Sequence, residues 1–259
     1  FTAIQFMILL TQLLMCGVAT LDKNMLVGPF PDVFSEWGGK NPYLLLVDSQ
    51  HYRLVTSLFL NVGVIHLIIN AYCTLETAYR YEREWGTPSF LIVFFVSGIA
   101  GVATSCVFDP DTIAVCSSGP LLGVFGAKFA QVLSWTCFDM DERATNLEDV
   151  GLEQLGNLTC SIAMLLVMSF LTFVDFSGNM GSMCVGFLVG MFLFCRPIEN
   201  LCVRFMWGIM LGLFLLLGYG YAITYLLLNY TETDEDMEDS CKYFSNIFPE
   251  GYDCDCVWN

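Results

Sequence analysis

The stretch VDFSGNMGSMCVGFLVG, residues 174–190, is apolar and carries glycines four positions apart, at Gly186 and Gly190. Small residues at that spacing lie on one face of a helix and let neighbouring membrane helices approach closely. The stretch also holds one amide side chain, Asn179, near its start. It therefore predicts a closely packed membrane helix with a polar group at one end.

The composition of the whole chain also indicates a membrane protein. Of its 259 residues, 56% are hydrophobic and 14% charged, and the mean hydropathy is +0.62. A soluble domain of this length would carry more charged surface, so we predict an all-α polytopic membrane protein. The net charge is −16, and nine acidic residues lie within the last thirty positions. With ten Lys and Arg residues, nucleic-acid binding lacks an electrostatic basis and is excluded.

A helix that crosses a bilayer needs about 20 apolar residues, and runs of that order recur along the chain. We predict seven such helices, at 1–20, 54–75, 87–107, 112–136, 155–174, 176–195 and 205–229. Lys128 lies within the fourth, so it must snorkel or face protein. We expect an acidic surface segment at 137–154 and a turn of about one residue, Asp175, between the fifth and sixth helices. Because the sequence begins at Phe1 rather than Met, we expect residues before it and make no prediction about a signal peptide.

The domain prediction is a transmembrane domain over 1–229 followed by an acidic tail over 230–259. The tail holds Cys241, Cys254 and Cys256, which favours at least one disulfide and an oxidising compartment. No histidine accompanies these cysteines, so we predict no metal site. The other nine cysteines lie in or beside apolar runs and are read as small hydrophobes. Arginines in the short loops, together with the tail cysteines, place the tail on the lumenal or extracellular side, in the secretory pathway or plasma membrane.

Four blocks of sequence carry polar or small residues at defined positions beside predicted helices, and their order along the chain is informative. HYRLVTSLFLNVGVIHLIIN, residues 51–70, has Arg53 before a helix and places His66 and Asn70 on one helical face. EREWG, residues 82–86, precedes the third helix, and CSSGPLLGVFGA, residues 116–127, opens the fourth. With the stretch at 174–190, these blocks resemble the rhomboid family of intramembrane serine proteases over roughly residues 38–197. The resemblance is greatest to the eukaryotic secretory-pathway branch, and it implies six core helices plus a C-terminal seventh.

In that family a serine and a histidine form a dyad in a water-filled cavity within the membrane, and no cofactor is used. The resemblance puts Ser118 at the nucleophile position and His66 and Asn70 at the positions that donate hydrogen bonds to the oxyanion. Cys116 replaces the first glycine of the serine motif, and Asn61 and Pro120 are further departures. The remaining matching positions are architectural: Arg53, Glu82, Gly86, Gly119, Gly123, Gly186 and Gly190.

The sixth-helix block lacks the base of the dyad. Aligning its glycines without a gap places Asn179 where the histidine stands in the family. An amide cannot accept the serine proton near neutral pH, whereas imidazole can. The chain has two histidines; His51 lies outside the second helix and His66 matches the oxyanion position. We therefore predict a fold without the reaction.

Three functions remain open. The first is a pseudoprotease that binds transmembrane helices of client proteins between helices two and five, in the lipid bilayer. The second is an active serine endopeptidase that uses Ser118, with Asn179 an engineered or unusual replacement of the base. The third is a fixed subunit of a larger membrane complex, with the tail as a docking element. A channel is disfavoured because no helix carries paired charges. Taken singly, Ser118, His66 and Asn70 could also be ordinary buried polar residues of a helix bundle.

Overall fold

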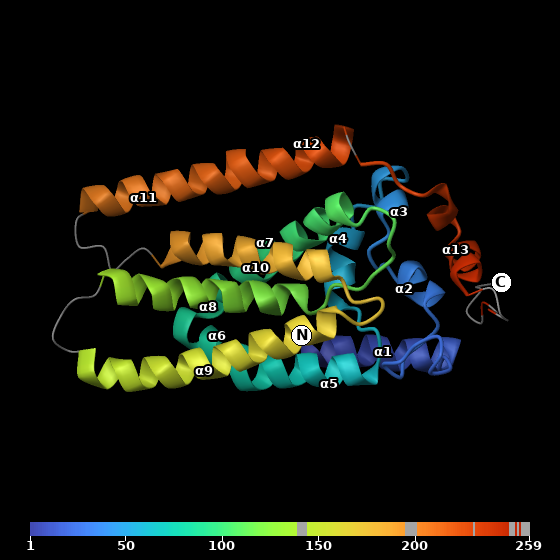
Figure 1. The fold of residues 1–259 in the computed structure, drawn as a ribbon, viewed down its shortest axis with the longest axis horizontal. Helices are drawn as coiled ribbons and strands as arrows, with labels where there is room; N and C mark the ends of the chain where they lie inside the picture. Colours follow the sequence, from blue (N-terminus) through green and yellow to red (C-terminus); the bar gives the residue numbers. More distant parts are fainter. Residues whose placement is uncertain (139–143, 195–200, 230, 249–251, 253, 255–259) are drawn as a thin grey trace.

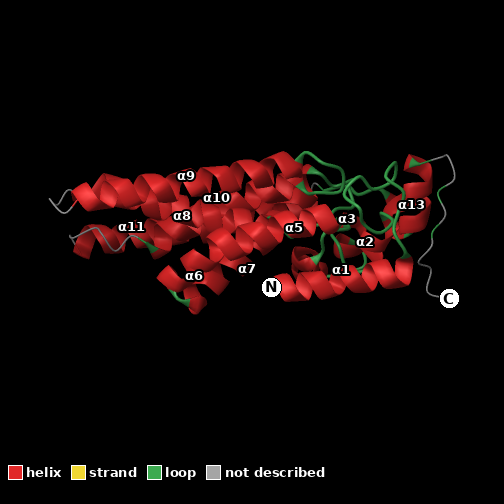
Figure 2. Cartoon of the chain, turned by 90° about the horizontal axis from the view of Figure 1, so that it is seen from below, coloured by secondary structure: helices red, strands yellow, loops and turns green. Residues whose placement is uncertain are grey.

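The computed structural model describes residues 1–138, 144–194, 201–229, 231–248, 252 and 254. Its regular elements over these residues are helices. Two isolated β-bridges pair loop segments, Lys40 with Ala114 and Val115 with Val174. The long helices run side by side as a bundle, and the loops with short helices gather at one end (Figure 1; Figure 2). The tail helix lies at that same end, which we call the loop end of the bundle.

Three long helices form the centre of the bundle: α7 (Thr87–Phe108), α8 (Gly119–Phe138) and α10 (Phe176–Leu193). They approach so closely that side chains do not fit at their glycines. A Cβ on Gly186 would lie 2.0 Å from the carbonyl oxygen of Gly123, and one on Gly190 would lie 2.6 Å from the Cα of Ala127. The small residues predicted to pack therefore lie at the α8–α10 crossing, where they set the distance between these two helices.

The second predicted helix, 54–75, is wrong as one continuous helix. The chain forms α4 (Arg53–Thr56) and the 3₁₀ turn η1 (Ser57–Phe59), then breaks, and resumes as α5 (Val64–Tyr72), the π-helical η2 (Cys73–Ala78) and α6 (Tyr79–Trp85). The two parts are bent by 87°. The break exists because residues 61–63 bond to the first loop: the Asn24 side chain donates to the Val62 carbonyl at 2.9 Å, and a Cβ on Gly63 would lie 2.3 Å from the Leu26 carbonyl oxygen.

Two other predicted boundaries also differ. The helix expected from 112 begins at Gly119, because Ala114 and Val115 are extended and form bridges to Lys40 and Val174. The helix expected over 155–174 is α9 (Ala144–Ser169), which also takes up part of the predicted surface segment. The turn after it spans 170–175, longer than the single residue expected, and Phe173 has a positive φ of 67°.

The other predicted regions contain helices with nearby bounds. The first is α1 (Thr2–Cys16), and the last is α11 (Leu201–Leu213), the π-helical η3 (Phe214–Gly220) and α12 (Tyr221–Asn229). Among the described residues, three helices are long and apolar enough to cross a membrane: Thr87–Phe108, Phe176–Leu193 and Arg204–Asn229. The bent pair 53–59 and 64–85 raises the number to 4 if it counts as one span. The six-plus-one arrangement stays a prediction.

The acidic tail folds back onto the first loop. That loop contains α2 (Asp32–Glu36) and α3 (Pro42–Leu46), and the tail contains the 3₁₀ turn η4 (Glu235–Glu238) and α13 (Ser240–Ile247). Figures 1 and 2 show α13 beside α2 at the loop end. A disulfide joins Cys241 to Cys254, with 5.9 Å between their Cα atoms; Cys256 lies outside the described residues. Cys16, read as a small hydrophobe, is disulfide-bonded.

Candidate active site

Ser118 and Asn179 face each other across the start of α8 and the first turns of α10. Both side chains are buried, and the Ser118 hydroxyl donates a hydrogen bond of 3.0 Å to Oδ1 of Asn179. A Cβ on Gly119 would lie 3.5 Å from that same oxygen. The residue at the nucleophile position and the residue at the base position are therefore in direct contact.

Asn179 is held in one orientation by a second serine. Its Nδ2 donates to the hydroxyl of Ser169 at 2.5 Å, and that hydroxyl donates to the Leu165 carbonyl at 2.8 Å. Because the Ser169 hydroxyl already donates its one proton to a backbone carbonyl, it can only accept a hydrogen bond from the Asn179 amide. The amide oxygen is consequently the atom that points to Ser118.

The two residues at the oxyanion positions lie on α5, and one of them is engaged inside the fold. Asn70 donates through Nδ2 to Asn61 Oδ1 at 2.8 Å and to the Ser117 hydroxyl at 3.0 Å. The Ser117 hydroxyl donates to the same Asn61 oxygen at 3.1 Å. An amide nitrogen has two protons, so both Asn70 donors are used within this triangle.

His66 is fully buried and accepts a backbone hydrogen bond. The Val62 N–H donates to its Nδ1 at 3.3 Å, so in the neutral ring the proton resides on Nε2. That Nε2, the Asn61 Nδ2 and the Asn70 Oδ1 are buried without a hydrogen-bond partner. Buried polar atoms are nearly always bonded, so this corner of the site is suited to a polar group such as water or a peptide amide.

One carboxylate joins the serine motif to α10. Asp175 is 3% exposed; its Oδ1 accepts from the Gly178 N–H at 2.8 Å and from Ser105 at 2.6 Å, and its Oδ2 accepts from the Cys116 thiol at 3.0 Å. Asp175, expected in the turn between the fifth and sixth helices, is the N-cap of α10, and its burial is compensated by these three donors. It fixes Cys116, two residues before Ser118, against the first turn of α10.

A buried lysine supports this carboxylate through Ser105. Lys40 is fully buried, and its Nζ donates to the Ser105 hydroxyl at 2.7 Å, the Asp109 carbonyl at 2.8 Å and the Thr112 hydroxyl at 2.8 Å. Its positive charge is thus linked to Asp175 by the shared serine. The first loop, α7 and α10 are held together by this polar chain.

Three of the architectural positions, Arg53, Glu82 and Gly86, lie on or next to elements other than the one that Ser118 precedes. Arg53 donates to the Ser35 and Gly39 carbonyls at 2.5 and 3.1 Å, which anchors the first loop. Glu82 accepts from the Thr87 hydroxyl at 2.9 Å, and Gly86, with a φ of 80°, allows the turn between α6 and α7. Lys128 faces protein, as its position required, with Nζ 2.7 Å from Glu84 Oε2.

Sequence reasoning missed Ser169, Ser117, Lys40 and the burial of Asp175. Only Asp175 had a usable signal, since an aspartate three residues before Gly178 at a helix start is typical of an N-cap. The others depend on contacts such as Lys40 with Ser105, which are 65 positions apart.

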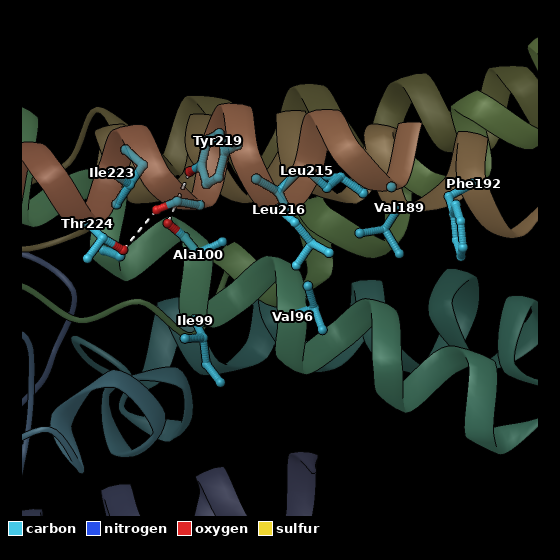
Figure 3. Close-up of a pocket in the computed structure, with 14 residues that line it drawn as sticks. Val96, Ile99, Ala100, Val189, Phe192, Leu215, Leu216, Tyr219, Ile223 and Thr224 are labelled. Carbon is cyan, nitrogen blue, oxygen red and sulfur yellow. Dashed lines mark hydrogen bonds between the residues drawn. The ribbon is translucent and has the colours of Figure 1, made fainter. Parts of the chain in front are cut away.

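An apolar cavity in the bundle is separate from this site. It measures about 450 Å³ and lies between α7, α10 and the η3–α12 segment (Figure 3). Val96, Val189, Leu215 and Tyr219 are among its lining side chains, and the Tyr219 hydroxyl donates to the Ala100 carbonyl at 3.2 Å. Neither Ser118 nor Asn179 lines it, so this cavity is not where the candidate chemistry would occur.

Comparison with known proteins fits the geometry. The Rhomboid domain family matches residues 48–196. RHOMBOID-like protein 6, mitochondrial, and RHOMBOID-like protein 7, both of Arabidopsis thaliana, are 27% and 30% identical over 68% of this chain and 55% and 53% of their own lengths. Rhomboid-like protease 3 of Toxoplasma gondii is 31% identical over 59% of this chain and 55% of its own. The chain thus spans about half the length of these relatives.

The family match covers more than half of the chain and includes Ser118, Asn179, His66 and Asn70. It also includes both partners of the glycine-packed crossing between α8 and α10. The chain belongs to the rhomboid family of multi-pass integral membrane proteins.

Proposed function

We propose that this chain is a rhomboid-like pseudoprotease that binds transmembrane segments of client proteins without cleaving them. The observation that carries the proposal is the hydrogen bond from the Ser118 hydroxyl to Asn179 Oδ1 at 3.0 Å. An amide oxygen accepts a hydrogen bond but does not take the proton near neutral pH, so the serine stays a neutral alcohol. Loss of the base from such a unit removes several orders of magnitude in rate.

No described neighbour is placed to replace the missing base. His66 uses Nδ1 to accept the Val62 N–H, and the Asp175 carboxylate is bonded to Ser105, Gly178 and Cys116. The Asn70 amide protons are both donated inside the Asn61–Ser117 triangle, which leaves them unavailable to an oxyanion. The general base is therefore missing, and of the two residues at the oxyanion positions only His66, through its Nε2–H, keeps a donor that is not already bonded.

The second candidate is an active intramembrane serine endopeptidase. It is favoured by the retained Ser118–Gly119 pair and by relatives such as Rhomboid-like protease 3, whose name denotes a protease. In this reading Asn179 would only orient the hydroxyl, and a water molecule would have to accept the proton.

The remaining parts of the proposal concern the membrane. Six core helices plus a seventh, formed by α11 to α12, would span the bilayer within residues 1–229, with 230–259 on the lumenal or extracellular side. Clients would reach the site between α5 and α9, the second and fifth of these helices. A fixed place in a larger membrane complex stays compatible with this arrangement.

The deciding experiment incubates the purified full chain in liposomes with a generic transmembrane substrate, beside Ser118→Ala. We expect no cleavage by either protein, and photo-crosslinking of the substrate helix to both. Cleavage that disappears in Ser118→Ala would overturn the proposal in favour of the protease.

A serine-reactive fluorophosphonate probe adds a gain-of-function arm. The natural chain should not be labelled at Ser118, whereas Asn179→His supplies an imidazole at the same position and should give measurable labelling. The matched control is Asn179→Gln, which keeps an amide and should stay unlabelled. Labelling of the natural chain that equals that of Asn179→His would contradict the assignment of Asn179 as a vacated base position.

A further inference from the structure

We propose that the C-terminal tail is a built-in clamp on the loop end of the bundle, where Ser118 and Asn179 lie. In this proposal Phe244 of α13 and Met237 of η4 hold the α9–α10 turn in place, and that turn positions Asp175 and Asn179. The inference does not depend on whether the site is active, because it concerns what keeps the site closed.

The α9–α10 turn contains a backbone conformation that needs external support. Phe173 has a φ of 67°, a region in which a bulky residue is rarely found and which is strained for it. Its carbonyl accepts the Val115 N–H at 3.0 Å, so the turn is tied to the segment that leads into the serine motif. Such a conformation persists only where surrounding contacts determine it.

Aromatic rings from two distant segments provide those contacts. The Phe173 ring lies 5.9 Å from that of Phe244 in the tail, edge-on, and 5.8 Å from that of Phe34 in the first loop. Phe244 is 1% exposed and Phe34 fully buried. Edge-to-face aromatic pairs at such distances are attractive beyond the burial of their rings, so they oppose the strain at Phe173.

Polar contacts fix the tail over the same place. The Asn41 side chain donates to the Met237 carbonyl at 2.8 Å, and the Tyr243 hydroxyl donates to the Asp111 carbonyl at 2.6 Å. Asn41 is adjacent to Lys40, and Asp111 lies in the loop whose Thr112 binds that lysine. The tail is therefore bonded to the segments that carry the polar chain to Asp175.

The apolar cluster beneath the tail is made of the sequence neighbours of site residues. Met237 and Phe244 belong to one buried cluster with Leu60 and Val62, which flank Asn61, and with Val115, Met168 and Val174, which precede Cys116, Ser169 and Asp175. Removal of the tail side chains would loosen the backbone at each of these points. The opening should be local, because the cluster that contains Cys73 includes none of the tail residues that the structure describes.

Native cysteines give a direct measurement of this opening. Cys116 is a buried free thiol that donates to Asp175, and Cys73 is a buried free thiol in the other cluster. The full chain in detergent is treated with a small maleimide, and the labelling rate of each cysteine is followed by peptide mass spectrometry. Phe244→Ala should raise the rate at Cys116 about tenfold or more and leave Cys73 unchanged.

The matched control is Ile247→Ala on the same helix, where the side chain is 49% exposed; neither rate should change. Tyr243→Phe, which removes only the hydrogen bond to Asp111, should give a smaller rise at Cys116, and it decides the question if Phe244→Ala does not fold. An unchanged Cys116 rate in the folded variants would overturn the proposal. So would equal rises at Cys116 and Cys73, since these would indicate general loosening rather than release of a clamp.

Discussion

Helices α8 and α10 contact each other in two regions that are stabilised by different interactions. Along their middle, the backbones of the two helices touch at Gly123 and Gly186, where a Cβ on Gly186 would lie 2.0 Å from the Gly123 carbonyl oxygen. At their loop end the same helices meet through polar side chains, where Ser118 donates to Asn179 at 3.0 Å. The first contact depends on an absent side chain, and the second on hydrogen bonds that several residue types could make. The middle should therefore tolerate no substitution, whereas the loop end can change its chemistry without losing the fold.

The largest effect is expected where the helices touch. Gly186→Ala places a methyl group against the Gly123 carbonyl oxygen, so α8 and α10 must move apart, and we expect a chain that fails to reach its folded state. The control is Gly156→Ala on α9, which meets nothing within 4 Å and should gain up to about 1 kcal/mol in helix stability. Size-exclusion profiles and apparent Tm in detergent measure both. Equal behaviour of the two variants would mean that the close crossing does not stabilise the bundle.

The second largest effect is expected at Asp175, whose carboxylate joins the serine motif to the first turn of α10. Asp175→Ala leaves Ser105, Gly178 and Cys116 without their acceptor and the buried Lys40 without a linked negative charge. We expect a loss of about 3 kcal/mol in the free energy of unfolding. Asp48→Asn, at an exposed position, serves as the control and should change the apparent Tm little. A loss at Asp175 no larger than that of the control would show that the polar chain is not structural.

A much smaller effect is expected at the serine itself. Ser118→Ala removes one neutral hydrogen bond and leaves the Asn179 oxygen without that donor, which should cost about 1 kcal/mol. Crosslinking of a client helix should persist, because the proposed function does not use the hydroxyl. Ser105→Ala, which breaks the link between Lys40 and Asp175, should destabilise the chain more. If Ser118→Ala abolished client crosslinking, the Ser118 hydroxyl would take part in client binding, and the loop end of α8 and α10 could not change its chemistry without loss of function.

The sequence predicts the features that depend on local spacing, and it does not predict those that depend on contacts between distant residues. The glycine spacing in 174–190 predicted the close helix, and the order of motifs placed Asn179 opposite Ser118. The break at 60–63 could not be predicted, because the run 54–75 around it is largely apolar and contains no proline, and single Asn and Gly residues are tolerated in membrane helices. The helix breaks because Asn24, 38 positions earlier, bonds to Val62. The docking of the tail depends on contacts such as Asn41 with Met237, which are 196 positions apart. An acidic composition indicates a solvated segment and carries no sign of the two apolar side chains that are buried.

The smallest expected effect tests the tail through pH. Partial desolvation of this exposed side chain, then the negative charges of Asp32 on its own helix and Asp239 at the start of α13, raise the pKa of Glu36 from 4.5 to about 7. Because the folded state favours the protonated carboxyl, this contribution to stability is complete below pH 4.5 and is lost as the pH rises through about 7.

We therefore expect the amide protons of α13 to exchange faster at pH 8 than at pH 5, after correction for the intrinsic pH dependence of exchange. Glu36→Gln mimics the protonated form and should remove most of that difference, while Glu232→Gln, at an exposed position outside this group of carboxyls, should preserve it. If Glu36→Gln kept the full pH dependence, the charge repulsion between the Glu36 and Asp239 carboxylates would not affect the docking of α13 on α2. The tail would then be held by Phe244 and its hydrogen bonds alone, and the contrast between the loop end and the glycine-packed middle would rest on packing and neutral polar contacts.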